Sequence, residues 1–132
     1  MNKPEKRMID FIKKHHVLTL ATSNNNKPYC ANCFYTFLED ESAFVFTSDM
    51  NTKHIQDSIN QNYVGGSVVL ETSVIGKIQG IQFNGTIFKA ENDLLEKANM
   101  AYIKRFPLAA LMNTTLWVLK LSFIKMTDNR LG

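Results

Sequence analysis

Cysteine, proline and glycine are scarce in this sequence, and long apolar runs are missing. The 132 residues include 2 cysteines, 3 prolines and 6 glycines. Two cysteines are too few for the disulfide scaffold of a small secreted protein. The amino-terminal residues lack the apolar core of a signal peptide, and no apolar run approaches the roughly 18 residues of a membrane-spanning helix. We therefore expect a cytoplasmic protein without a membrane partner.

Catalytic sequence signatures are also lacking. The sequence contains no G-x-G-x-x-G dinucleotide motif, phosphate-binding P-loop, H-E-x-x-H zinc motif or G-x-S-x-G nucleophile elbow. The net charge is only +3, from 15 basic and 12 acidic residues. That balance suits a small anionic ligand, and the aromatic residues alternate as core residues do, so we expect no nucleic-acid partner. An enzyme of this kind would take its chemistry from a cofactor.

What the sequence does contain is a regular succession of short strands and helices, which we assign to one domain, residues 1–132. Hydrophobic residues make up 45% of the chain, enough for a core at this length. Periodicity predicts helices over residues 4–15, 52–60 and 93–105, with one more helical turn at 108–112. It predicts strands over residues 17–22, 29–37, 43–47, 67–71, 77–90 and 116–126.

The links between the predicted strands are short and polar, which is typical of antiparallel pairing. Residues 23–28 are expected to form a turn, and Gly85 a bulge in the longest strand. Six or more strands would leave exposed edges unless the sheet closes on itself. The predicted fold is therefore α+β and mainly β, an antiparallel split β-barrel of six or more strands with flanking helices.

The segment from Phe44 to His54 is the most informative part of the sequence. A strand ends there, hydroxyl and amide side chains cluster, and a helix begins with Lys53 in its first turn. A helix amino terminus presents N–H groups and a partial positive charge, to which Thr52 adds a hydroxyl and Lys53 a full charge. These features predict a phosphate site. The simpler alternative is that Asn51 or Thr52 only caps the helix.

Cys30 and Cys33 have the spacing of redox and zinc motifs. They lie within a predicted strand, where side chains three residues apart point to opposite faces, so the two thiols should not meet. We expect both cysteines to be buried small apolar side chains without a redox or metal role. His15 and His16 are expected at the surface or a helix end, while His54 either lines a ligand or is solvated.

A strand that ends in Phe-Thr-Ser and leads through Asn-Thr-Lys into a helix is typical of one family. With this order of elements, the chain resembles the pyridoxamine 5'-phosphate oxidase-like, FMN-binding split-barrel proteins, and more closely an uncharacterised bacterial subgroup of them. The matching segments are residues 29–35, 80–85, 105–107 and 125–129. The resemblance implies a homodimer in which FMN lies across the subunit interface.

The resemblance also implies which residues contact the cofactor. Thr52 and Lys53 would hold the phosphate, with Asn51 beside them. The residues along the isoalloxazine would be Ala31, Asn32, Cys33 and Phe34, and those around the ribityl chain and ring edge would be Phe46, Thr47 and Ser48. Gln79 or Gln82 would reach the ring from a later strand, and the partner subunit would contribute Arg105 and Trp117.

Two departures from the family pattern bear on function. The oxidases proper have Arg-Lys where this chain has Thr52 and Lys53, and another arginine at the position of Ala31. Fewer cations predict a weaker attraction for phosphate, and the residues that hold pyridoxine phosphate are not recognisable, so we do not expect the vitamin B6 reaction. The leading hypothesis is an FMN-dependent oxidoreductase or flavin reductase acting on a small molecule. The alternative is a non-catalytic flavin or haem carrier or sensor.

Overall fold

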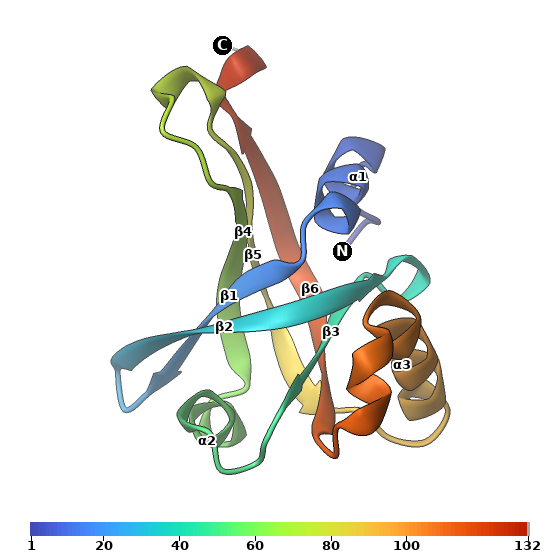
Figure 1. Cartoon of the computed structure of the whole chain (residues 1–132). Helices are drawn as coiled ribbons and strands as arrows, with labels where there is room; N and C mark the ends of the chain where they lie inside the picture. Colours follow the sequence, from blue (N-terminus) through green and yellow to red (C-terminus); the bar gives the residue numbers. More distant parts are fainter. Residues whose placement is uncertain (132) are drawn as a thin grey trace.

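The computed structural model describes residues 1–131, and within them six antiparallel strands close into a barrel (Figure 1). The strands are β1 (Val17–Asn24), β2 (Lys27–Leu38), β3 (Ala43–Ser48), β4 (Tyr63–Leu70), β5 (Gln79–Lys89) and β6 (Thr115–Asp128). The helices are α1 (Lys6–Lys14), α2 (Lys53–Asn60) and α3 (Asn92–Arg105). Short 3-10 segments lie at Glu39–Glu41, Ile75–Lys77, Pro107–Leu111 and Asn129–Leu131. The predicted fold class is confirmed.

The strand order around the barrel is β1-β2-β3-β6-β5-β4, so the first and fourth strands complete the circle. β5 pairs with β6 along its whole length, whereas β1 and β4 pair at only three positions, from Thr19 to Ala21. Closure removes the unpaired edges that an open sheet would expose. No helix within residues 1–131 is both long enough and apolar enough to cross a membrane.

A bulge interrupts the β5–β6 pairing between Asn84 and Gly85, where the sequence predicts one. A Cβ atom at Gly85 would lie 2.3 Å from the carbonyl oxygen of Lys120. Any side chain at this position would therefore push the two strands apart, and glycine allows the close approach that the bulge needs.

The β1–β2 hairpin is tighter than expected. In place of a turn over residues 23–28, both strands continue and leave a two-residue turn at Asn25 and Asn26. Their φ angles of 52° and 61° lie in the left-handed region, which asparagine tolerates better than most residues and which suits a two-residue hairpin. β4 also begins earlier than expected, at Tyr63.

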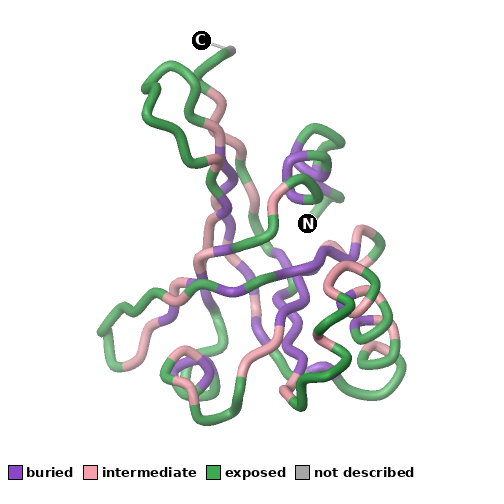
Figure 2. The backbone as a smooth tube through the Cα atoms, in the orientation of Figure 1, coloured by how far each residue is buried: buried purple, intermediate pink, exposed green. Residues whose placement is uncertain are grey.

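Two hydrophobic clusters hold the molecule together, and Figure 2 traces the buried segments. The first fills the barrel and includes Ile12 of α1 and Ile55 of α2, both fully buried. The second lies between α3 and the outer face of β2, β3 and β6, where Ala98 and Tyr102 pack on Val45 and its neighbours. Because Ile55 is fixed in the barrel core, the amino-terminal turn of α2 has a defined position beside the strands. Ile59, one helical turn further on, is exposed.

Candidate functional site

A groove of about 370 Å³ opens between the outer face of β2 and the carboxyl-terminal end of α3. Its lining comprises residues of β2, β3, α3 and the segment that follows α3: Asn32, Cys33, Phe34, Thr47, Tyr102, Phe106, Leu108, Ala109 and Met112. Most of these side chains are apolar, with a few polar groups among them. This combination is typical of a small-molecule site.

Aromatic rings form one wall of the groove. The rings of Phe34 and Phe106 meet edge to face with centroids 5.6 Å apart, and Phe34 is 58% exposed although it is apolar. The Tyr102 hydroxyl donates to the Phe34 carbonyl at 3.3 Å and lies 3.4 Å from Thr47 Oγ1. Burial raises the pKa of Tyr102, so the phenol stays protonated as a donor. The groove therefore offers a flat apolar surface beside fixed polar groups.

The segment predicted to bind phosphate lies where β3 leads into α2. The Thr52 hydroxyl donates to the Asp49 carbonyl at 2.8 Å, and α2 begins at Lys53 without a side-chain cap from Thr52. Thr52 is thus the N-cap residue, as the alternative prediction has it, but its side chain makes no capping hydrogen bond. Asn51 is exposed at the turn before the helix. Since no side chain of Thr52 caps them, the first N–H groups of α2 can donate to an anion.

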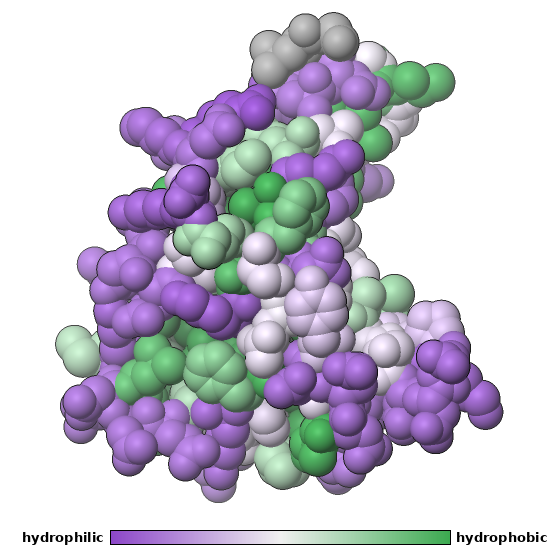
Figure 3. All heavy atoms as spheres, turned by 180° about the vertical axis from the view of Figure 1, so that it is seen from behind, coloured by the Kyte–Doolittle hydropathy of each residue, from purple (hydrophilic) through white to green (hydrophobic). Residues whose placement is uncertain are grey.

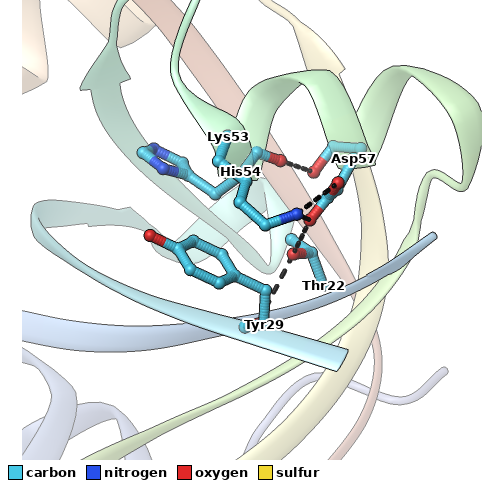
Figure 4. A network of polar contacts seen from close by, with 6 residues as sticks. Thr22, Tyr29, Lys53, His54 and Asp57 are labelled. Carbon is cyan, nitrogen blue, oxygen red and sulfur yellow. Dashed lines mark hydrogen bonds and ion pairs between the residues drawn. The ribbon is translucent and has the colours of Figure 1, made fainter. Parts of the chain in front are cut away.

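Lys53 contacts a carboxylate that the sequence analysis did not single out (Figure 4). Lys53 Nζ lies 3.3 Å from both carboxylate oxygens of Asp57, and 4.9 Å from the centroid of the Tyr29 ring. The Asp57 side chain is only 4% exposed, against 57% for Lys53. The Thr22 hydroxyl donates to Asp57 at 3.1 Å. The cation predicted for a phosphate is thus already paired with a buried anion.

A second polar cluster joins the end of β3 to α2. Ser48 Oγ lies 2.7 Å from His54 Nε2, and the Trp117 indole N–H donates to the Ser48 carbonyl at 3.0 Å. Burial lowers the pKa of His54, partly offset by the Asp57 carboxylate. Burial also raises the pKa of the Cys33 thiol to about 11, against a smaller opposing effect of Ser48. Cys33 is therefore a protonated thiol at neutral pH, not a nucleophilic thiolate.

The structure brings only part of the predicted residues together. Asn32, Cys33, Phe34 and Thr47 line the groove, and Ser48, Asn51, Thr52 and Lys53 surround the start of α2. Ala31 is half-buried on β2, and Phe46 is fully buried in the barrel core. Cys30, predicted to be buried, is exposed, because the outer face of this part of β2 carries no covering helix.

Four predicted residues lie apart from the groove and have partners within their own chain. Arg105 donates to the carbonyls of Tyr35, Lys13 and His15, tying α3 to β2 and the end of α1. Trp117 is buried beside Ser48. Gln82 accepts from Thr127, and Gln79 accepts from Arg130, at 3.1 and 3.0 Å. Contact of these residues with a cofactor stays a prediction.

Sequence reasoning missed Asp57, Tyr102 and Phe106 as site residues. The sequence predicts only that Tyr102 lies in a helix, and its hydroxyl contacts Phe34 of β2 and Thr47 of β3, which are distant in the sequence. Phe106 precedes Pro107 at the end of α3. This position indicates where the helix ends, but it does not indicate which residue the Phe106 ring contacts. Asp57 has one local signal, its position four residues after Lys53.

Solved structures establish the fold of this chain, and related sequences establish its family. No family model matches the chain. Over 93% of its length it superimposes on an FAD-binding protein of Mycobacterium smegmatis, covering 92% of that protein, with a TM-score of 0.74 and 14% identity. It also superimposes on HutZ, the haem storage protein of Vibrio cholerae, with a TM-score of 0.76 and 14% identity over 97% of this chain and 95% of that one.

A putative pyridoxamine 5'-phosphate oxidase of Listeria innocua gives a TM-score of 0.70 at 10% identity, over 91% of this chain and 94% of that one. At such identities the likeness establishes the split-barrel fold. Two further matched structures are longer, and the chain spans 58% and 60% of them.

Sequence likeness is stronger to a group of bacterial proteins. A UPF0306 protein of Photorhabdus laumondii is 38% identical over 122 residues, which cover 92% of this chain and 85% of the relative. A UPF0306 protein of Yersinia pseudotuberculosis is 35% identical over 134 aligned positions, covering all of this chain and 91% of the relative. With this identity over nearly the whole length, the chain belongs to the UPF0306 family.

Proposed function

We propose that the protein binds a flavin, with FMN as the first candidate, and that the ring lies in the groove beside Phe34 and Phe106. The observation that carries this proposal is the exposed aromatic wall of the groove, next to the fixed hydroxyl of Tyr102 and to Thr47. A flat apolar ring with polar edges matches such a site. The names of the structural neighbours, which include FAD-binding proteins and a haem storage protein, support a planar cofactor of this kind.

The start of α2 is the proposed place for the cofactor's phosphate. The end of β3 connects the two places, because Thr47 lines the groove and the next residue, Ser48, contacts His54 in the first turn of α2. An elongated cofactor with its ring in the groove would therefore extend its tail past the end of β3 towards the start of α2. A bound flavin would supply hydride or electron transfer to a small substrate, and the residues of this chain would orient the ring and tail.

A second copy of the chain is the proposed partner. The outer face of β4, β5 and β6 includes Tyr63, Val69 and Phe123, each more than half exposed. Seen from behind, apolar and near-neutral side chains run through the middle of the molecule, with strongly hydrophilic ones mainly towards the edges (Figure 3). A face of this kind suits an isologous contact, which would cover the apolar side chains.

Titration with FMN, followed by visible absorption and flavin fluorescence, tests the proposal. Phe34→Ala should raise the dissociation constant for FMN about tenfold, the scale of a lost aromatic contact. Phe88→Ala is the matched control, because Phe88 is also an exposed phenylalanine on a strand but lies outside the groove. Its affinity should match that of the unchanged protein.

Failure of the unchanged protein to bind FMN in the micromolar range would contradict the proposal. A Soret band on addition of haem, without flavin binding, would favour the haem alternative. Analytical ultracentrifugation of the same samples tests the partner, and a monomer at all concentrations would contradict the proposed dimer.

A further inference from the structure

The Lys53–Asp57 pair determines how much positive charge the start of α2 can offer to a ligand. Asp57 is nearly inaccessible to water, and its charge is balanced by one hydroxyl donor, Thr22, and one cation, Lys53. A buried carboxylate without its cation would strongly destabilise the fold, so Lys53 stays close to Asp57. The pair as a unit has no net charge.

The neighbouring groups do not restore a positive field. Asp49 lies in the turn that leads into α2, and it adds a further negative charge. The Thr52 hydroxyl is turned towards the Asp49 carbonyl and not towards the helix amides. A phosphate placed at Lys53 would therefore also meet the Asp57 carboxylate just behind it, and the repulsion between the two anions would offset much of the attraction to the ammonium group.

We propose that Asp57 is a specificity-determining residue that lowers the preference of this site for phosphorylated over unphosphorylated flavin. The inference rests on the proposed flavin site and adds to it a ligand preference: the unchanged protein binds riboflavin and FMN with similar affinity. The flavin ring provides most of the binding free energy, and the phosphate adds little because Asp57 neutralises the cation that would hold it.

The experiment measures the dissociation constants of riboflavin and of FMN for each variant and compares their ratio. Asp57→Asn keeps the shape of the side chain and an oxygen that accepts from Thr22, but removes the negative charge. The preference for FMN should then rise about tenfold or more, with riboflavin affinity unchanged, because Lys53 is freed for the phosphate. Lys53→Met should have the opposite effect and lower FMN affinity about tenfold relative to riboflavin.

Asp10→Asn is the matched control. Asp10 also follows a lysine by four residues on a helix, and the substitution makes the same change in net charge at a distant site. Its ratio should equal that of the unchanged protein.

An unchanged or lower preference for FMN in Asp57→Asn, with riboflavin still bound, would overturn the inference and leave the flavin site standing. A strong preference for FMN in the unchanged protein would also overturn it. Loss of riboflavin and FMN binding alike in every protein, including the unchanged one, would overturn the proposed function and this inference together. Circular dichroism of each variant establishes that the fold is retained.

Discussion

Two helices of this molecule carry the same pair of residues at the same spacing, and the two pairs differ in almost every physical respect. On α1, Lys6 and Asp10 approach to 2.7 Å with side chains 88% and 59% exposed. On α2, Lys53 and Asp57 are 3.3 Å apart, yet the carboxylate is 4% exposed. The pair with the shorter distance is the one exposed to water, and there each ion is also well solvated without its partner.

The difference teaches that burial, not distance, decides the importance of an ion pair. Asp10 has solvent as an alternative partner, so its loss leaves no unsatisfied group. Asp57 is buried between α2 and β1, and its charge is balanced by contacts with Lys53 and Thr22. The four predictions that follow test this difference between α1 and α2, from the largest expected effect to the smallest.

Lys53→Met should lower the free energy of unfolding by about 1–3 kcal/mol, because it leaves the Asp57 carboxylate buried without a cation. The value lies below that of a fully buried pair because Lys53 is half exposed. Urea unfolding at neutral pH measures it. Adding Asp57→Asn to the same protein should recover most of the loss, and Lys6→Met should give a change too small to resolve. Equal losses for the two lysine variants would contradict the comparison.

Histidine titration should distinguish the same two helices. Burial lowers the pKa of both His54 and His15, but the charged neighbours of His15 lower it further, whereas Asp57 raises that of His54. Asp57→Asn should therefore move the NMR titration midpoint of His54 to lower pH and leave His15 unchanged. A midpoint for His54 that stays or rises would show that Asp57 does not act on the ring.

The pH dependence of stability follows from these directions. A histidine whose pKa is lower in the folded than in the unfolded state contributes stability above about pH 6.5, which is lost as the pH falls through the folded value. In Asp57→Asn the lower folded pKa of His54 should make the loss of stability on acidification larger than in the unchanged protein. Urea unfolding between pH 5 and 7 measures this slope.

The smallest effect is expected on α1. Asp10→Asn removes the hydrogen bond and charge that raise the pKa of Lys6, but both side chains remain solvated. Thermal unfolding should show no resolvable shift at physiological salt, and at low salt only a slight one, since screening weakens exposed pairs. A loss as large as that of Lys53→Met would show that distance matters more than burial.

The fold was accessible from the sequence because it rests on local periodicity. Within residues 1–131, each of the three helices and six strands overlaps the range that the spacing of apolar residues predicts, and the bulge lies at Gly85. The errors concern elements whose limits are set by distant partners. In the first hairpin, β1 continues to Asn24 and β2 begins at Lys27, because the two strands pair up to the turn. The polar residues of this segment predict a longer turn instead.

The candidate site was less accessible, for the same reason. The family pattern predicts Phe34 and Thr47 as site residues. It does not indicate that the ring of Phe106 and the hydroxyl of Tyr102 contact them from the end of α3, although Tyr102 lies 68 residues after Phe34 in the sequence. Asp57 lies in the polar sequence Gln56–Asp57–Ser58, which is typical of a solvated helix face. Its burial depends on Thr22 in β1, and no local pattern of α2 reveals that contact.

The short pairing between β1 and β4 has a consequence for how the barrel opens. Only three positions pair there, and Gly66 brings the strands so close that a Cβ atom would lie 2.7 Å from the Thr19 carbonyl oxygen. Fewer hydrogen bonds must break at this seam than along β5 and β6, so its amide hydrogens exchange with solvent at a lower cost in free energy. Because Thr22 follows directly in β1, transient opening of the seam also loosens the hydroxyl that donates to Asp57. The helix α2, where we propose that the phosphate binds, therefore shares the mobility of the barrel's weakest junction.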